Sequence, residues 1–389
     1  MGLWEHSKEN SVRPARTQVY LLPSERSVIR AFHSGVSLHS HTEHSRERLS
    51  ALPRHLERMP VVSQFMKWEI ERHRAKTGEA PDFSRAYWRG PLSARAAFDL
   101  ERGQIERLGL AAMVSLTDHD NIDAGLLLYS QSPAAAIPIS VEWTVPYERT
   151  YFHVGVHNLA PARASASMQR MADYTSNPKI SALGPMLEEL EADPAVLIVL
   201  NHPLWDMAGI GFDSTLALAK RFLQEYGSRI HALEINGLRA WPENLGVVSL
   251  AESTGRPVVA GGDRHGLEPN AAVNLTRATS FAEFAEEIRV DRSSDIAVLP
   301  QYREPLVLRH FLTAWDAVRE HPKLAGRQRW IARVFVLCDD GIERPLSKIW
   351  INGAPPWIDP CLNVIGLLAS RPLRVPFRLT VPLAGSAML

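Results

Sequence analysis

The sequence predicts an α/β protein built around a mostly parallel β-sheet. Short aliphatic or β-branched runs recur along the chain, at residues 35–39, 110–117, 135–142, 150–157, 195–201, 230–236 and 256–263. Runs that are apolar at nearly every position are typical of strands buried on both faces, as in parallel sheets. Segments with helical periodicity separate them, at 91–109, 165–175, 184–194 and 214–227. This alternation favours either a parallel barrel or a doubly wound sheet.

Two stretches interrupt the alternation. Residues 48–90 are rich in Arg and Glu and read as an insertion after the first strand. They contain an amphipathic helix candidate at 60–76, whose charges we expect on a solvated face. Beyond residue 300, a helical segment at 305–321 precedes two apolar runs joined by Asp340 and Gly341, and this turn predicts a β-hairpin.

These features divide the 389 residues into an N-terminal extension (1–30), a main domain (31–300) and a C-terminal accessory α+β region (301–389). Basic and acidic residues number 43 each, so no overall field favours nucleic acid or a membrane as partner. The N-terminus is polar and no apolar run approaches the ~18 residues of a membrane span, so we expect a cytoplasmic protein. The two cysteines have no metal-type spacing, and the sequence indicates no oligomeric state.

Residue types that bind metals stand at the ends of the predicted strands. They are His39, His41, Asp118, His119, Glu142, His153, His202, Asp263 and His265. Residues two apart on an extended segment, such as His39 and His41, project to the same face. In a parallel α/β barrel the carboxyl ends of the strands converge on one mouth, where active sites are built. We therefore expect side chains from positions 39 to 265 to meet in space.

The chemistry of such a set is distinctive. Imidazoles and carboxylates together suit borderline divalent cations such as Zn²⁺, Mn²⁺ or Fe²⁺, and the absence of cysteine ligands argues against a structural zinc site. A set this large favours two or three ions about 3.5–4 Å apart. Glu142 is the natural bridge, because each of its oxygens can hold one ion. Clustered ions lower the pKa of a shared water, so metal-bound hydroxide is the expected nucleophile.

The order of the motifs resembles that of a known family. "HSHTEHS", "LTDHD", "VEW" followed by "FHVG", "NHP" and "GGDRHG" resemble the PHP (polymerase and histidinol phosphatase) domain over about residues 31–300. The resemblance implies a distorted, TIM-like (β/α)7 barrel of the PHP type with two or three metal ions. It also implies hydrolysis of phosphate esters, which is the activity of most characterised members of the family.

The resemblance further implies which residues hold each ion. The first site would consist of His39, His41, Glu142 and Asp263. The second, bridged by Glu142, would add His153 and His202. The third would comprise Glu47, His119 and His265. Asp118 would stand behind the ligands and orient one of them, and Glu234 in "LEINGL" is expected to play a similar supporting part.

The sequence departs from the family pattern around the first motif. Ser37 stands where the family usually has Asp. "SRE" replaces the usual "SDG", so that Arg46 occupies the acidic position and Glu47 the glycine position. His44 is an alternative to Glu47 as a ligand of the third site. Arg46 and Arg264 lie beside predicted ligands, and we expect them to bind phosphate oxygens of the substrate.

The leading functional prediction is a metal-dependent phosphoesterase acting on a small phosphomonoester or a nucleotide. One alternative prediction is a hydrolase of a non-phosphate ester or amide, which would use the same metal centre. A non-catalytic metal-binding PHP module is the alternative from a different class. The apolar run that contains His153 breaks at Asn158, so His157 is expected in a loop.

Overall fold

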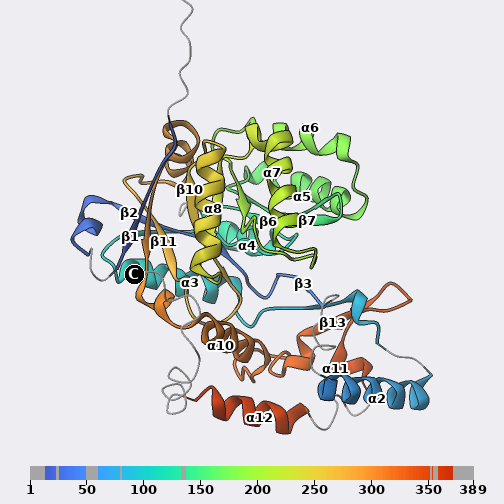
Figure 1. Cartoon of the computed structure of the whole chain (residues 1–389). Coiled ribbons are helices and arrows are strands. Elements are labelled where there is room, and N and C mark those ends of the chain that lie inside the picture. The colour runs from blue at the N-terminus through green and yellow to red at the C-terminus, as the bar shows by residue number, and fades with distance from the viewer. Residues whose placement is uncertain are drawn as a thin grey trace, which may run out of the picture.

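A ten-stranded mixed β-sheet forms the centre of the protein in the computed structural model, which describes residues 14–22, 26–49, 60–78, 81–132, 137–350, 353 and 358–370 (Figure 1). The strands run in the order β1-β12-β11-β2-β10-β9-β8-β7-β6, and β5 pairs with β2. They are β1 (Arg16–Leu21), β2 (Ser34–Ser40), β5 (Ala111–Val114), β6 (Val141–Tyr147), β7 (Thr150–His157), β8 (Leu197–Asn201), β9 (Ala232–Asn236), β10 (Val258–Arg264), β11 (Ala272–Thr276) and β12 (Ser293–Val298).

The prediction of parallel strands is confirmed for part of this sheet. β2 is parallel to β5 and β10, and β9 is parallel to β8 and β10. β6 and β7 instead form an antiparallel hairpin, and β7 is antiparallel to β8. Only Glu148 and Arg149 join β6 to β7, and a connection this short can only reverse the chain. Glu148 has the positive φ, 49°, that tight hairpin turns often require.

The strand ladders of the described residues do not close into a barrel, so the fold shown is a mixed α/β fold with a large central sheet. One parallel bridge, between His119 and Glu142, links the segment after β5 to β6. The same segment contacts β2, because the N–H of Thr117 donates to the carbonyl of Ser40 over 2.9 Å. The segment that carries His119 therefore lies between β2 and β6.

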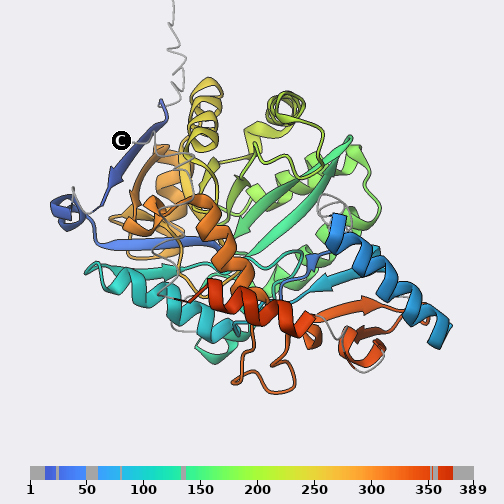
Figure 2. The ribbon, with the colours of Figure 1, turned by 60° about the horizontal axis from the view of Figure 1, so that its bottom comes forward.

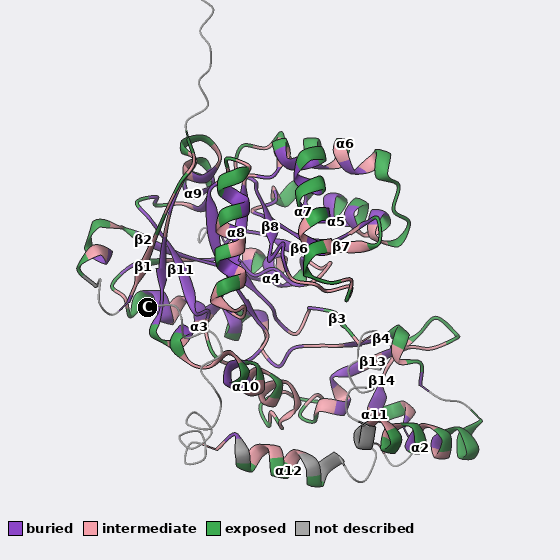
Figure 3. Ribbon diagram, viewed as in Figure 1, coloured by how far each residue is buried: buried purple, intermediate pink, exposed green. Residues whose placement is uncertain are grey.

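Both faces of the central strands are buried, as the sequence predicts (Figure 3). In β8, Ile198 and Leu200 join the apolar cluster on the helix side of the sheet. Leu197 and Val199 join a second cluster on the opposite face, together with Phe284 of α9 (Phe281–Glu286). The alternation follows from the two-residue period of a strand.

Helices cover the outer face of the sheet. α3 packs on β2 and β5, α5 on β6, and α8 on β9. The covering helices are α3 (Ala94–Glu106), α4 (Asp123–Gln131), α5 (Pro161–Ser176), α6 (Ile180–Glu191), α7 (Phe212–Tyr226) and α8 (Trp241–Ser253). Among the described residues, no helix combines the length and the apolarity that a membrane crossing needs.

A second sheet joins the insertion to the C-terminal region (Figures 1 and 2). Its order is β14-β13-β4-β3, with β3 (Glu47–Arg48), β4 (Ala86–Trp88), β13 (Val334–Leu337) and β14 (Glu343–Pro345). The predicted hairpin is confirmed: β13 and β14 pair antiparallel around Gly341, whose φ is 77°. Beside this sheet lie α2 (Pro60–Thr77), α10 (Leu306–Val318), α11 (Leu346–Ile349) and α12 (Ile358–Leu368). The insertion after β2 and the C-terminal region thus form one sheet.

The helix predicted at 60–76 is confirmed as α2, but the expectation that its charges are solvated is wrong for two residues. Glu69 and His73 are each 3% exposed. The His73 ring stacks on Trp350 at a centroid distance of 4.9 Å, which explains its burial. Two aromatic side chains of the same helix, Phe65 and Trp68, are half exposed instead.

Trp143 provides a test of the main core. It is fully buried on β6 next to Glu142, and its indole N–H donates to the carbonyl of Met171 over 3.1 Å. Trp143→Ala leaves a large cavity and is expected to lower the free energy of unfolding by about 3–5 kcal/mol. Urea unfolding measures the change. The matched control is Trp68→Ala, at a half-exposed position, with an expected loss below about 1 kcal/mol; equal losses in the two variants would contradict this assignment of the core.

Candidate metal centre

The side chains predicted as ligands gather at one end of the main sheet. His39 is the penultimate residue of β2 and His41 directly follows the strand; His202 directly follows β8. The other positions are Glu47 on β3, His119 after β5, Glu142 on β6, His153 on β7, Asp263 on β10 and His265 just after β10. The members of this set therefore come from seven strands or the segments that directly follow them.

The carboxylate of Glu142 lies at the middle of the cluster and is fully buried. Its Oε2 atom is 2.9 Å from His39 Nε2, 3.3 Å from His41 Nε2 and 3.2 Å from His119 Nδ1. Its Oε1 atom is 3.1 Å from both His153 Nδ1 and His202 Nε2. Five imidazoles therefore surround one carboxylate, and each oxygen faces a different subset of them.

Three overlapping groups in this cluster can each hold a cation, because their ligand atoms lie within 4.8 Å of one another. The first group is His39, His41, Glu142 and Asp263. The second is His119, Glu142 and His153. The third is His41, Glu47, His119 and His265. Glu142 is shared between the first two groups, which suits a bridging ligand.

Two differences from the sequence-based assignment stand out. The second group contains His119 where His202 was expected, although His202 still lies 3.1 Å from Glu142. The third group contains His41 in addition to the expected Glu47, His119 and His265, and the Oε2 atom of Glu47 lies 3.1 Å from both His119 Nε2 and His265 Nε2. His44, the alternative to Glu47, instead faces Asp123 at 4.0 Å.

Poorly paired buried atoms show that the cluster suits a cation. His39 Nε2, His41 Nε2, His153 Nδ1 and Glu142 Oε2 are buried without a well-formed hydrogen bond, although each lies within 3.3 Å of another polar atom of the cluster. Burying a polar atom without such a bond costs roughly 1–3 kcal/mol, so four such atoms in one place need an explanation. Imidazole nitrogens and carboxylate oxygens are the ligands that Zn²⁺, Mn²⁺ and Fe²⁺ accept, and such ions would satisfy all four.

Backbone strain is concentrated at the same residues. His39, His202 and Asp263 have φ angles of 64°, 28° and 50°, in the left-handed region that non-glycine residues rarely occupy. Each such residue costs about 1–3 kcal/mol and persists where the surrounding structure fixes it, commonly at functional sites.

Glu234 supports the first group, as expected. Its Oε2 atom lies 2.7 Å from His39 Nδ1, which leaves His39 Nε2 directed at Glu142 and Asp263. A carboxylate behind a histidine fixes the ring orientation and raises the basicity of the ligand nitrogen. Gly261 leaves room for this carboxylate, because a Cβ atom there would lie 2.3 Å from Glu234 Cδ.

Asp118 acts through the backbone and not on a ligand ring. Its two oxygens accept the N–H and the hydroxyl of Thr42, over 2.5 and 2.7 Å. Thr42 follows His41 directly, so Asp118 holds the turn that carries this ligand. Burial raises the pKa of Asp118 to about 7, against the effect of the Thr42 hydrogen bonds.

The electrostatics of the cluster favour proton storage on three histidines when no cation is bound. Against the effect of burial, Glu142 and Glu234 hold the pKa of His39 well above its ordinary value. Burial lowers the pKa of His41 to about 3, and His265 adds to the effect. Burial is the largest single effect on His119 and His265 and disfavours their charged forms. Glu47 together with Glu142 at His119, and with Asp263 at His265, outweighs burial and raises the pKa values to about 10 and 9. Burial alone would raise the pKa of Glu142, yet His39 and His119 hold it well below its ordinary value.

The predicted arginines have different placements. Arg46 is 48% exposed and lines the cavity above the cluster. Arg264 is 3% exposed; its Nε atom pairs with Glu101 at 2.8 Å and its Nη2 atom donates to the carbonyl of His41 over 3.1 Å. The expectation that Arg264 binds substrate is therefore corrected: its donors hold the ligand-bearing segments together.

Glu101 on α3 was missed by sequence reasoning. Besides Arg264, it accepts the hydroxyl of Ser37 over 3.0 Å. It thus places a carboxylate beside the position where the PHP family usually has Asp. Asn201 was also missed; it donates to Glu142 Oε1 over 3.1 Å and precedes His202 in "NHP". Asn201 stands at a strand end, which is a usable signal, whereas Glu101 sits within a regular helical pattern that gives none.

The expectation that His157 lies in a loop is wrong. It is the last residue of β7 and is 1% exposed, with Nδ1 2.8 Å from the hydroxyl of Ser115. Pairing with β8 keeps β7 extended through this position, because Val156 and His157 lie opposite Ile198 and Leu197. Burial lowers the pKa of His157 to about 3, so it is a neutral hydrogen-bonding group behind the cluster.

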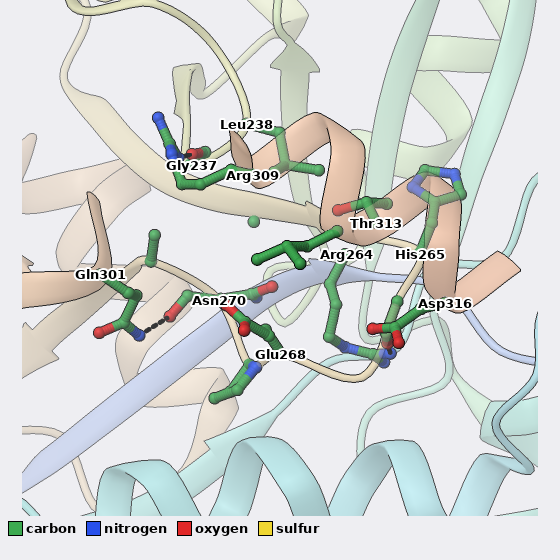
Figure 4. A pocket seen from close by; sticks show the side chains of 15 residues that line it. Gly237, Leu238, Arg264, His265, Glu268, Asn270, Gln301, Arg309, Thr313 and Asp316 are labelled. Carbon is green, nitrogen blue, oxygen red and sulfur yellow. Dashed lines mark hydrogen bonds between the residues drawn. The ribbon is translucent and has the colours of Figure 1, made fainter. Parts of the chain in front are cut away.

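Helix α10 supports the loop that carries His265 (Figure 4). Asp316 accepts the N–H of Leu267 over 2.8 Å, two residues beyond His265. Arg309 of the same helix donates to the carbonyl of Gly237, in the loop after β9. The accessory region therefore holds two loops at the metal-binding end of the sheet.

A cavity of about 620 Å³ opens over the cluster. Ligand residues Glu47, His119, His153, Asp263 and His265 contribute to its lining. The remaining wall includes two basic and two aromatic side chains, which are Arg46, Arg48, Tyr151 and Trp205. The cluster is thus accessible to a small organic molecule.

Comparison with known proteins gives little beyond this geometry. No family model and no curated protein matches the sequence. PsfC from Pseudomonas syringae PB-5123 is 14% identical, with a TM-score of 0.40 over 72% of this chain and 98% of that one. An amidohydrolase from Chromobacterium violaceum with bound sulfate and no metal is 15% identical, with a TM-score of 0.32 over 45% and 83% of the two chains.

A protein from Bifidobacterium adolescentis assigned as a metal-dependent phosphoesterase is also 15% identical, with a TM-score of 0.33 over 52% of this chain and 92% of that one. Likeness at this level supports no conclusion about activity. The functional argument therefore rests on the residues of this chain.

Cation binding is expected to release protons. At pH 8, His119 and His265 of the cation-free protein are charged, since their pKa values are about 10 and 9, and a metal ion requires neutral imidazole. Titration of Zn²⁺ or Mn²⁺ in buffers of different ionisation enthalpy should show release of at least about two protons, with a further contribution from His39, whose pKa is also raised. Affinity should rise as pH increases toward 10. His265→Gln should remove about one proton from the count; release of none by the unaltered protein would contradict the proton-storage account.

Removal of the carboxylate behind His39 is expected to weaken cation binding. Glu234→Gln keeps the size of the side chain but no longer fixes the ring or raises its basicity, so affinity should fall about 10- to 100-fold. Competition with a chromophoric chelator measures the loss. Glu189→Gln, which affects an exposed pair with Arg170, is the control and should have no effect. Equal affinity in the two variants would show that Glu234 does not support the centre.

Proposed function

We propose that this protein is a metal-dependent phosphoesterase of the PHP type, which hydrolyses a small phosphomonoester or a nucleotide. The observation that carries the proposal is a set of four buried ligand atoms without a well-formed hydrogen bond, one on Glu142 and three on the histidines around it. These residues belong to overlapping ligand groups under an open cavity. The residues fit two or three divalent ions, with Mn, Zn and Fe as the candidates.

The ions would activate the nucleophile and neutralise negative charge on a phosphoryl group. The protein residues hold the ligand atoms in place before any substrate arrives. Glu234 fixes the ring of His39, and Asp118 fixes the turn after His41 through Thr42. Such preorganisation is what stabilises developing charge without rearrangement during the reaction.

Two arginines in the cavity wall support an anionic substrate, although Asp120 and Asp206 also line the cavity. Arg46 and Arg48 lie on one side of the opening, and Arg48 is held by Asp120 at 3.7 Å. Guanidinium groups bind phosphate oxygens with paired N–H donors, which an ester without charge would not need. Tyr151 and Trp205 on the remaining wall offer apolar surface to the leaving group. These features favour a phosphoester over an amide.

The proposal extends to the fold and its boundaries. The bridge between His119 and Glu142 joins the two ends of the strand run β5-β2-β10-β9-β8-β7-β6, which supports a distorted (β/α)7 barrel over residues 31–300. Residues 1–30 and 301–389 would be additions to this barrel. The second sheet, which combines the insertion with the C-terminal region, would form one wall of the substrate cavity.

A substrate screen tests the proposal. Protein stripped of metal and reloaded with Mn²⁺, Zn²⁺ or Fe²⁺ should release phosphate from members of a panel of phosphomonoesters and nucleotides, and the stripped protein should not. His153→Asn should lower kcat at least about 100-fold, because it removes a ligand. His33→Asn is the control, since His33 is exposed and contacts Ser34 instead of the cluster. Full metal loading without phosphate release from any ester, or hydrolysis of amides that inorganic phosphate does not inhibit, would overturn the proposal.

A further inference from the structure

The second sheet delivers three consecutive residues to the cavity. β3 contributes Glu47 and Arg48, and Arg46 directly precedes it. All three line the cavity over the metal cluster. β3 is only two residues long and pairs with β4 through Glu47–Trp88 and Arg48–Tyr87. The position of this triplet therefore depends on how firmly the rest of the second sheet holds β4.

A side chain from the C-terminal hairpin contacts the first residue of the triplet. Glu343, at the start of β14, has its Oε1 atom 3.1 Å from Arg46 Nη1. The guanidinium carbon of Arg46 also lies 5.2 Å from the ring centroid of Tyr87 on β4, which is within the range of a cation–π interaction. Arg46 is thus held between a carboxylate and an aromatic face.

The groups that hold Arg46 are themselves fixed. The Tyr87 hydroxyl donates to Glu343 Oε2 over 2.6 Å, so the carboxylate bridges the tyrosine and the arginine. The ring of Tyr87 stacks on Phe335 of β13 at 5.5 Å. β13 pairs with both β4 and β14, which connects these residues through the backbone as well.

We propose that Glu343 is a positioning residue that orients Arg46 toward an oxyanion of the substrate, so that the C-terminal hairpin sets the affinity of the site for a phosphoryl group. The inference rests on the proposed phosphoesterase function. It assigns to residues 334–345 a specific part in substrate binding, nearly 300 positions away in sequence from Arg46 and Glu47.

Two physical effects of Glu343 oppose each other. Its negative charge reduces the attraction of Arg46 for an anion, but the two side chains are 48% and 31% exposed, so solvent screens this effect. Its contact also restricts a long side chain that would otherwise lose rotamer freedom when substrate binds, and Tyr87 adds to this restriction through its hydrogen bond to Glu343 and its ring contact with Arg46. An arginine has five N–H donors, so the contact through Nη1 leaves others for a phosphate oxygen. Orientation therefore outweighs charge at this position.

The test compares variants of the metal-loaded full chain. Glu343→Gln and Tyr87→Phe should each weaken the binding of inorganic phosphate about three- to tenfold, measured by calorimetry. With a hydrolysed phosphoester, both should raise KM by a similar factor and leave kcat unchanged. Asp339→Asn is the matched control, because Asp339 lies on the same hairpin and pairs with Arg85 at 2.7 Å; its phosphate affinity should equal that of the unaltered protein.

A double-mutant comparison separates positioning from a general structural role. In an Arg46→Ala background, Glu343→Gln should have no further effect on phosphate affinity. An equal effect in both backgrounds, a fall in kcat together with a lower melting temperature, or phosphate binding that is unchanged or tighter in Glu343→Gln would overturn the inference. The proposed function fails separately, if no ester is hydrolysed. Phosphate binding still tests the role of Glu343 in that case, and absence of phosphate binding overturns it.

Discussion

The burial of one carboxylate among five imidazoles is the constraint on which the rest of the structure depends. Glu142 has no solvent contact, and its neighbours come from strands spread over most of the chain. A buried charge is stable only when it is paired or coordinates a metal. The strained backbone at His39, His202 and Asp263 and the glycine that makes room for Glu234 are all consistent with a centre fixed in advance of ligand binding.

The surrounding structure holds the ligand-bearing segments from behind. Asp118 anchors the turn after His41, and the Glu101–Arg264 pair reaches the carbonyl of the same residue. On the outer side, α10 holds the loop that follows His265. Loops that carry ligands are therefore supported by hydrogen bonds to regular elements, which is how positions can be maintained with the accuracy that coordination requires.

Local sequence patterns predicted the strands that carry or precede most of the ligands, several of the covering helices and most of the cluster. They did not predict β1, β11 and β12, and they placed the strand before Glu142 at 135–142, whereas β6 spans Val141–Tyr147. A histidine or carboxylate at the end of an apolar run is visible in sequence, and parallel strands bring such ends together. What could not be predicted are contacts set by distant pairing. Glu47 could not be separated from His44 by spacing, because its position depends on β3, β4 and the C-terminal hairpin. The burial of Arg264 depends on Glu101, which nothing in its own helix distinguishes.

The central claim is that these residues bind a shared group of cations, and anomalous X-ray scattering tests it most directly. Crystals of the purified protein measured at the Mn, Fe and Zn edges should show two or three anomalous peaks about 3.5–4 Å apart, with Glu142 between two of them. A single peak away from Glu142, or none in crystals grown with excess metal, would contradict the account.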